Sequence, residues 1–365
     1  MKFSASREVV FTPLHAVIGV VERRQTMPIL GNVLLSVADG KLTITATDLE
    51  VELLAEGEVA VESPGDITVP GRKLHDICRA LPDNALLEFT LSGDRMTVKA
   101  GRSRFTLSTL RAAEFPVVDE VTVQQTLQLK RQELRQLLEQ TQFSMAQQDV
   151  RYYLNGLLFE TDGKTLRAVA TDGHRLALAE LEMNEPAQRN EQIIVPRKGV
   201  LELQRLLDGD GDVGLTLGAN HVQAQIEGIR FTSKLIDGKF PDYGRVVPAE
   251  PQNIVTSDRE LMRHALQRAA ILSNEKYRGV RLALDANNVT IQANNPEQEE
   301  AEESVEVEYS GEGMEIGFNV TYLLDALNAV GAEQVEIALA DTNSSCLIRA
   351  PGSRDSKFVV MPMRL

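Results

Sequence analysis

One short stretch of the chain carries three side chains that could act together as a catalytic centre. Asp172, His174 and Arg175 lie within four residues, and a carboxylate beside an imidazole is a common general acid–base pair. The same stretch places Asp172-Gly173 between two runs of β-type residues, which is the pattern of a β-hairpin turn. The sequence therefore allows two interpretations: a hydrolase centre, or a structural turn that presents a surface.

The turn belongs to an internal repeat. Ala170-Thr171-Asp172 corresponds to Ala46-Thr47-Asp48 and more weakly to Ala293-Asn294-Asn295, at spacings of about 125 residues. Other markers keep the same register, including the phenylalanines Phe105, Phe231 and Phe358. The first and third copies lack the histidine and the arginine. A structural turn that carries these two side chains only in the second copy explains the pattern better than catalysis does.

Each copy has the same predicted order of elements: a helix, a hairpin, a linker with a strand, a second helix and a final run of strands. The first helices open near equivalent glutamates, Glu8, Glu133 and Glu260. The second helices start near Gly71, Arg197 and Val320. We expect Ser6 and Ser257 to be N-caps. The predicted fold class is α+β, with three tandem copies of one domain at residues 1–120, 121–250 and 251–365, separated by linkers at 117–120 and 248–251.

Composition excludes several classes of protein. The 365 residues are 43% hydrophobic and 25% charged, which is typical of a folded chain with more than one domain. No apolar run approaches the ~20 residues that span a bilayer, and the start is not that of a signal peptide, so we expect a cytoplasmic protein. The isolated Cys78 and Cys346 argue against a thiolate zinc site.

We expect no cofactor and no metal. The five histidines are dispersed, and the chain has no phosphate-binding loop of the Walker type. Residues 209–214 match a dinucleotide fingerprint formally, but they follow a predicted helix and carry two carboxylates where a pyrophosphate would lie. We interpret this segment as an acidic turn after a helix.

The formal net charge of −15 argues against a nucleic-acid partner, but its distribution favours one. The predicted helical segments are net positive as a group, so the acidic excess lies elsewhere. The pairs Arg131/Arg135 and Arg259/Arg263 are spaced by four, which places each pair on one helix face. The shared sign across equivalent helices indicates a surface that faces a polyanion.

Two oppositely charged edges indicate contact between two copies of the chain. The third copy carries an acidic run from Glu297 to Glu303, whereas the corresponding edge of the first copy is basic and includes Arg102 and Arg104. A head-to-tail contact between such edges closes into a ring when the rotation permits, and it covers exposed strand edges. The apolar end of the chain, 358–365, is either a last strand with a buried end or part of an adaptable hydrophobic groove.

Several longer stretches carry a resemblance to a known family. They are Asp149-Val150-Arg151-Tyr152-Tyr153-Leu154-Asn155-Gly156, Ile194-Val195-Pro196-Arg197-Lys198-Gly199, Ala269-Ala270-Ile271-Leu272-Ser273-Asn274-Glu275-Lys276 and Val360-Met361-Pro362-Met363-Arg364-Leu365. With these the chain closely resembles, essentially end to end, the bacterial DNA polymerase III β subunits, the sliding clamps. The resemblance implies a non-enzymatic processivity factor: a head-to-tail homodimeric ring of six domains, with helices inside and sheets outside.

The resemblance also implies partners and site residues. The ring would encircle double-stranded DNA without sequence specificity, and short peptides of polymerase subunits, the clamp loader and repair factors would dock between the second and third domains. DNA contacts map onto Arg24, Arg72, Gln148, Tyr152 and Tyr153, although the tyrosines could instead be packing residues. The peptide pocket maps onto Leu154, Thr171, Gly173, His174, Arg175, Leu176, Pro241, Arg245, Val246, Tyr322, Val359, Met361, Pro362 and Met363. By the resemblance, dimer contacts map onto Ile271 and Leu272, with Phe105 and Leu107 opposite. The two oppositely charged edges add Lys73, Arg102, Arg104, Glu297, Glu300 and Glu303 to the expected dimer interface.

Two other functions stay open at this point. One is a hydrolase that uses Asp172 and His174. The other is a static dimeric DNA-binding protein, which would hold DNA without sliding.

Overall fold

The computed structural model describes residues 1–21, 27–118, 121–248 and 253–364. The chain forms two compact units. The first contains Met1–Gln132 and Lys198–Leu235, and the second contains Glu133–Arg197 and Ile236–Leu365. Only residues 117, 118 and 248 of the two expected linkers are described; residues 119–120 and 249–252 lie outside the described residues.

The first unit is built on two antiparallel sheets. The five-stranded sheet has the order β5-β1-β7-β8-β9, with bounds Ala60–Ser63, Lys2–Ser6, Leu86–Ser92, Arg95–Ala100 and Ser103–Ser108. The eight-stranded sheet has the order β10-β15-β16-β17-β4-β3-β2-β6, with bounds Val123–Lys130, Asp212–Gly218, His221–Ile226, Ile229–Lys234, Val51–Glu58, Lys41–Thr47, Asn32–Ala38 and Gly65–Pro70. Alternating burial along strands such as β10 gives each sheet one face on the core.

The second unit repeats this plan. Its eight-stranded sheet has the order β14-β11-β12-β13-β25-β24-β23-β18, with bounds Gln192–Pro196, Gly156–Asp162, Thr165–Thr171, Arg175–Glu182, Ser356–Val360, Cys346–Arg349, Gln334–Leu339 and Asn253–Asp258. Its four-stranded sheet has the order β21-β20-β19-β22, with bounds Glu300–Glu306, Asn288–Asn294, Gly279–Asp285 and Met314–Asn319. The strand pairs of both units are antiparallel, as the hairpin-rich sequence predicts.

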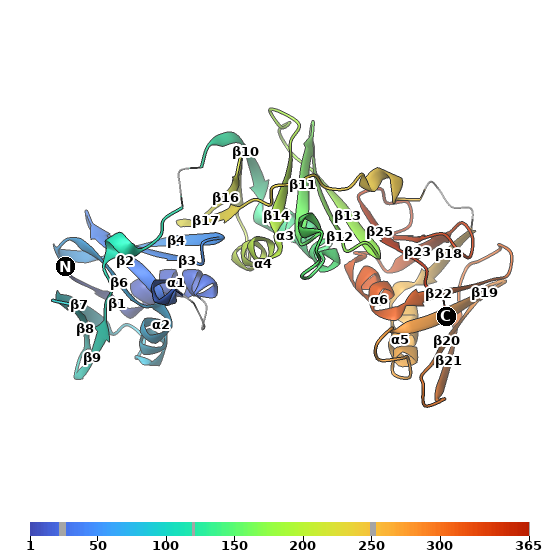
Figure 1. The fold of residues 1–365 in the computed structure, drawn as a ribbon, viewed down its shortest axis with the longest axis horizontal. Helices are drawn as coiled ribbons and strands as arrows, with labels where there is room; N and C mark the ends of the chain where they lie inside the picture. The colour runs from blue at the N-terminus through green and yellow to red at the C-terminus, as the bar shows by residue number, and fades with distance from the viewer. Residues whose placement is uncertain (22–26, 119–120, 249–252, 365) are drawn as a thin grey trace. The chain divides into compact units, whose positions relative to one another are not determined.

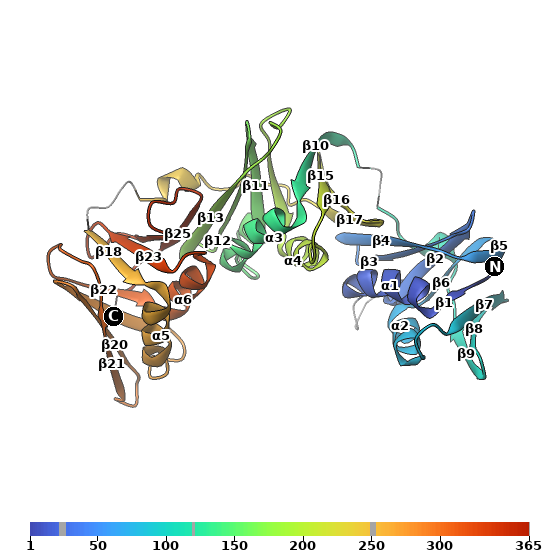
Figure 2. The same ribbon diagram turned by 180° about the vertical axis from the view of Figure 1, so that it is seen from behind.

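Amphipathic helices cover the core faces of the sheets. Helices α1 (Arg7–Val17) and α2 (Gly71–Ala80) lie side by side in the first unit, and α5 (Arg259–Ala270) and α6 (Val320–Ala329) do so in the second (Figures 1 and 2). Helix α3 (Arg131–Glu139) and helix α4 (Arg197–Leu206) span the points where the chain passes between the units. In the described part of the chain, no helix is long and apolar enough to cross a membrane.

The helix starts agree with the sequence predictions, but one predicted cap is wrong. Helices α2, α4 and α6 begin at Gly71, Arg197 and Val320. Ser6 is the N-cap residue of α1 without a side-chain cap bond, and α5 is capped by Asp258 rather than by Ser257. The Asp258 carboxylate accepts the Leu261 amide at 2.9 Å, a bond that also places a negative charge at the positive end of the helix dipole.

Both eight-stranded sheets join strands from two copies of the repeat. In the first unit, β17 of the second copy pairs with β4 of the first copy. In the second unit, β25 of the third copy pairs with β13 of the second copy. These are equivalent strands, so the chain contains the same copy-to-copy joint twice. Strand β9 is the equivalent of β17 and β25 in the first copy, and β21 is the equivalent of β4 and β13 in the third copy. Both lie at sheet edges and have one strand neighbour each within the described residues.

A histidine pair lies between α1 and α2 in the first unit. His15 Nδ1 lies 3.0 Å from His75 Nε2, and His75 is only 8% exposed. Burial, helped by the positive charges of His15 and Arg79, lowers the pKa of His75 against the opposing effect of Asp76. The unfolded chain therefore binds this proton more tightly than the folded chain does.

We expect stability to fall as the pH drops through the ordinary histidine range and to stop falling, for this group, below the folded-state pKa. The measurement is the thermal unfolding midpoint between pH 7.5 and pH 5. His75→Phe should reduce the loss, whereas the matched change His264→Phe at an exposed position should not. An equal loss in both variants would contradict the assignment to His75.

Candidate functional site

The Asp172 turn is a backbone-capping structure. Asp172 Oδ1 accepts the amides of His174 at 2.9 Å and Arg175 at 3.1 Å, and Thr171 Oγ1 donates to the Arg175 carbonyl at 2.6 Å. Gly173 has a φ of +88°, the left-handed conformation that favours glycine. The carboxylate is thus occupied by the turn that joins β12 to β13.

The other two copies use the equivalent side chain in the same way. Asp48 Oδ1 accepts the amides of Glu50 at 2.9 Å and Val51 at 2.7 Å, and Asn295 Oδ1 accepts the Glu299 amide at 3.0 Å. The acid or amide is therefore a turn-forming group in all three copies. This shared role does not support a hydrolase centre at Asp172 and His174.

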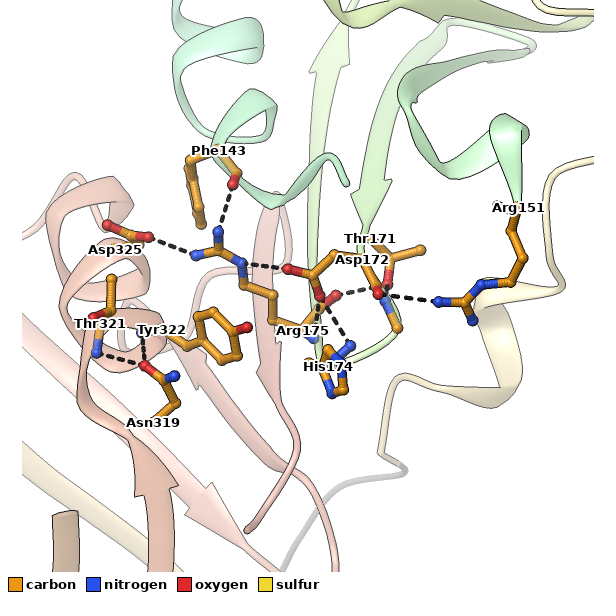
Figure 3. A network of polar contacts seen from close by, with 11 residues as sticks. Phe143, Arg151, Thr171, Asp172, His174, Arg175, Asn319, Thr321, Tyr322 and Asp325 are labelled. Atoms are coloured by element: carbon orange, nitrogen blue, oxygen red, sulfur yellow. Dashed lines mark hydrogen bonds and ion pairs between the residues drawn. The ribbon is translucent and has the colours of Figure 1, made fainter. Parts of the chain in front are cut away.

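Arg175 is the centre of a polar network that joins β13 to α6 (Figure 3). Its guanidinium donates to Asp172 Oδ2 at 3.1 Å, to Asp325 Oδ2 at 2.5 Å and to the Phe143 carbonyl at 2.7 Å. It also lies 4.5 Å from the centroid of the Tyr322 ring. The side chain is 13% exposed. Arg175 therefore positions the turn and Tyr322, and its charge is largely neutralised by two carboxylates.

The C-terminal strand lies directly beside the turn. Within the ladder of β13 and β25, Leu176 lies opposite Val359, and both side chains are 1% exposed. The Met361 amide then donates to the His174 carbonyl at 2.9 Å, and the Met363 amide donates to the Gly317 carbonyl at 2.9 Å. Met361 itself is 44% exposed. The predicted placement of the tail beside the turn is therefore observed, with an apolar side chain left at the surface.

A third segment packs on the same apolar cluster. Tyr243 and Val247, in and after the 3-10 helix η6 (Tyr243–Arg245), pack with Phe240 against the buried cluster that contains Leu176 and Val359. Nine residues of the predicted peptide pocket are called the docking surface below: Thr171, Gly173, His174, Pro241, Arg245, Val246, Met361, Pro362 and Met363. Val246 is 37% exposed and the Arg245 side chain is 87% exposed. Leu154 is buried in η5 (Tyr152–Leu154) beside Tyr153, which packs on the cluster.

Arg151 borders the docking surface, although it is not among the residues that the resemblance assigns to the peptide pocket. It forms a two-point ion pair with Asp149, whose pKa the hydrogen bonds from Arg151 lower to about 2. Its guanidinium also donates to the Asp172 carbonyl at 3.4 Å and lies 3.0 Å from the point that a Cβ on Gly173 would occupy (Figure 3). A side chain at position 173 would therefore displace Arg151. The pairing could have been anticipated only from the acid two residues before the arginine.

The predicted DNA contacts are distributed over both units. Gln148 lies in a loop of the second unit and has a φ of +56°, and Tyr152, the first residue of η5, is 58% exposed. Tyr153 is partly buried on the apolar cluster, as the packing alternative proposed. Arg72, in the first unit, donates to the Val21 carbonyl, and Arg24 lies outside the described residues. The DNA roles of these residues stay predictions.

The prediction that Arg131 and Arg135 lie together on a helix face toward a polyanion is wrong for Arg131. Arg131 is 7% exposed, and its guanidinium donates to the Asp208 carbonyl, to the Asp210 carbonyl at 2.9 Å and to Glu227 Oε1 at 2.9 Å. It thus holds the acidic turn after α4, because the carbonyls at a helix end lack partners within the helix. Arg131 therefore has a structural use and is not available to a polyanion. Of the predicted acidic turn at residues 209–214, residues 209–211 form the turn, whereas strand β15 already begins at Asp212.

The predicted dimer contacts fall on two strand edges and the end of a helix. In β9, Leu107 is buried, Phe105 half-buried and Arg104 exposed. Arg102, just before β9, and Lys73 of α2 are also exposed. After α5, Ile271 is 76% exposed and Leu272 half-buried. Glu297 and Glu300 are exposed. Glu303 has a partner in its own chain, because Arg268 donates to both of its carboxylate oxygens at 2.7 and 2.8 Å.

Metal chemistry finds no support among the described residues, where no group of three or more His, Cys, Asp or Glu side chains could hold an ion. The two cysteines are buried, and burial raises the thiol pKa of Cys78 to about 11 and that of Cys346 to about 12. Both are thiols rather than reactive thiolates at neutral pH.

Comparison with known proteins gives one consistent result. Family models of the DNA polymerase III beta subunit match residues 1–119 with the N-terminal domain, 128–242 with the central domain and 244–364 with the C-terminal domain. The chain is 56% identical to the beta sliding clamp of Pseudomonas aeruginosa and 52% identical to that of Escherichia coli, with 100% of each chain covered. It superimposes on the crystal structure of the DNA polymerase III subunit beta from Pseudomonas aeruginosa with a TM-score of 0.97 at 54% identity and full coverage of both chains. A sliding clamp of the same organism bound to griselimycin gives a TM-score of 0.96 at 55% identity, again with both chains fully covered.

Proposed function

Because the chain belongs to the family of DNA polymerase III beta subunits, we propose that it is a DNA sliding clamp that closes as a head-to-tail homodimeric ring around duplex DNA. It is a processivity subunit and not an enzyme. The three copies match the N-terminal, central and C-terminal domains of the family. We propose that it acts in the cytoplasm.

The observation that carries the ring is the repeated joint between copies. In the two joints within the chain, Phe231 of β17 lies opposite Leu53 of β4, and Phe358 of β25 lies opposite Ala177 of β13. Phe105 is the equivalent phenylalanine of β9, an edge strand of the first copy. Unpaired edges of this kind invite pairing with another chain. A second copy of the chain supplies the complementary strand, β21.

The repeat also predicts the register of this pairing. Ala301 in β21 faces an alanine of the preceding hairpin strand, as Leu53 and Ala177 do in their own copies. Phe105 should therefore lie opposite Ala301 of the partner subunit. In an antiparallel pair the next position brings Arg104 opposite Glu302 of the partner subunit, a pairing of opposite charges.

The hairpin turns add a second contact between neighbouring copies, because the turns of the first two copies each form an ion pair with a helix of the next copy. The turn of the first copy reaches α4 through an ion pair between Asp48 and Lys198, and the turn of the second copy reaches α6 through Arg175. By this pattern the turn of the third copy, which carries Glu297, should meet α2 of the partner subunit, where Lys73 is exposed. The predicted acidic and basic edges are thus equivalent to contacts that the chain already makes within itself.

We propose further that polymerase subunits, the clamp loader and repair factors dock short peptides on the docking surface. It combines exposed apolar side chains, Met361 and Val246, with the backbone groups of a tight turn. Such a surface suits a short apolar peptide segment, and methionine adapts to different partners. DNA contacts need no sequence reading, because phosphates attract basic side chains at any sequence.

Retention on DNA of two topologies tests the clamp function. When loaded on DNA, the protein should persist on a nicked circle and escape quickly from a linear duplex of the same sequence, because a closed ring leaves only over an end. Single-molecule fluorescence of the labelled protein measures both lifetimes, and a linear duplex blocked at both ends by bound protein is the control that should restore retention. Equal lifetimes on circle and open linear duplex would indicate a static DNA-binding protein instead.

A further inference from the structure

The eight-stranded sheet of the second unit carries a polar row that the docking surface does not explain. Gln192, Glu160, Arg167 and Glu180 lie opposite one another in the four neighbouring strands β14, β11, β12 and β13. Gln192 Nε2 donates to Glu160 Oε1 at 2.7 Å, Arg167 Nη1 donates to Glu160 Oε2 at 2.7 Å, and Arg167 Nε donates to Glu180 Oε1 at 2.6 Å. The row is therefore a continuous chain of charge-assisted hydrogen bonds.

Tyr243 of η6 ends in the middle of this row. Its hydroxyl donates to Glu160 Oε2 and accepts from Arg167 Nη1 at 3.0 Å. Burial raises the pKa of the phenol to about 12, helped by the hydrogen bond to Glu160. Burial acts to raise the pKa of Glu160 as well, but the hydrogen bonds from Tyr243, Gln192 and Arg167 outweigh it and lower that pKa. The phenol and the carboxylate thus stay in their bonded protonation states across the neutral range.

The ring of Tyr243 makes an apolar contact, whereas its hydroxyl makes the polar ones. The ring packs on the apolar cluster under the docking surface. The backbone continues the link: the amides of Val246 and Val247 both donate to the Tyr243 carbonyl, at 3.0 and 3.3 Å. Tyr243 is therefore held in three ways: by the packing of its ring, by the hydrogen bonds of its hydroxyl and by those of its carbonyl. Arg245 and Val246 of the docking surface follow it within one turn of the chain.

We infer that Tyr243 is a positioning residue for peptide docking: its hydroxyl, held by Glu160 and Arg167, fixes the 241–247 wall of the docking surface in its binding conformation. The inference rests on the proposed docking function. Segment 241–247 has little regular structure of its own, so without this anchor the wall would have to be ordered by the peptide at the expense of affinity.

The test uses the full-length protein and a fluorescent peptide that carries the clamp-binding segment of the replicative polymerase subunit. Tyr243→Phe keeps the ring and removes only the hydroxyl. Loss of a hydrogen bond to charged groups should weaken peptide binding by about tenfold or more. The matched control is Tyr309→Phe, because Tyr309 is 3% exposed and its hydroxyl donates to the Glu312 carbonyl at 2.7 Å, away from the docking surface. This control should leave peptide affinity unchanged.

A second readout follows the wall without the peptide. The chain contains no tryptophan, so Arg245→Trp, at a side chain that is 87% exposed, introduces a single reporter. Adding Tyr243→Phe should lower the fluorescence anisotropy of this reporter and increase its quenching by acrylamide, whereas Tyr309→Phe should not. Unchanged peptide affinity and reporter mobility in Tyr243→Phe overturn the inference, as does equal weakening by both tyrosine variants. If the wild-type protein fails to bind the peptide, the proposed docking function is wrong. The fluorescence of Arg245→Trp then decides by itself whether Tyr243 holds segment 241–247 in place.

Discussion

A variant with Ile271→Ala and Leu272→Ala should sediment as a monomer of 40.3 kDa, whereas the unchanged protein should sediment at about twice that mass. Ile271 is 76% exposed at the end of α5, a high value for a large apolar side chain. Each such side chain is worth about 2 kcal/mol when it is buried in a contact, and a ring of two chains contains this contact twice. Sedimentation equilibrium at micromolar concentration measures the result.

A charge exchange across the proposed strand pairing is the control for the dimer interface. Arg104→Glu should weaken the dimer because it places two acids opposite each other, and Glu302→Arg in the same chain should restore it. Both side chains are exposed in the single chain, so neither change should affect folding. A dimer that persists in the Ile271/Leu272 variant, or a double charge exchange that fails to rescue, would remove this interface assignment.

Deletion of Pro362–Leu365 should abolish most peptide binding while the dimer persists. The deletion removes two residues of the docking surface, Pro362 and Met363, together with the hydrogen bond from Met363 to the Gly317 carbonyl. Because a few apolar contacts in a groove carry most of the affinity for a short peptide, we expect a loss of about tenfold to a hundredfold. Fluorescence anisotropy with the labelled polymerase peptide measures the affinity.

A shorter truncation is the matched control. Removing only Arg364 and Leu365 keeps Pro362, Met363 and the bond to Gly317, so peptide affinity should change little. Analytical sedimentation of both truncations should show unchanged dimers. Normal affinity after the longer deletion would show that the tail is no part of the docking surface.

The family could be identified from the sequence because its signals are local and repeated. The Thr-Asp turn is specified by its own hydrogen bonds: a side-chain oxygen at Asp48, Asp172 or Asn295 caps the amides that follow it. Similar turns therefore appear wherever these residues occur, and the spacing of the copies follows. The starts of α2, α4 and α6 were predictable for the same reason, because each follows directly on a strand with a clear change in periodicity.

The use of individual charged side chains could not be predicted, because it depends on what lies opposite them in space. Arg131 follows a strand and opens a helix, which suggested a solvated face, yet it holds carbonyls about 75 to 80 residues further along the chain. Glu303 belongs to an acidic run, but Arg268 neutralises it from α5. Ion pairs of this kind join residues that have no fixed separation in sequence.

The sequence by itself determined the three-copy architecture, the family and the turn that bears Asp172, His174 and Arg175. These depend on hydrogen bonds between near neighbours and on hydrophobic periodicity. Only the tertiary structure decided what the turn does: Asp172 caps the backbone, Arg175 binds Asp325 of α6, and the His174 carbonyl accepts the Met361 amide. Residues far apart in sequence meet there because β13 pairs with β25, and that long-range pairing turns an apparent catalytic cluster into one wall of a docking surface.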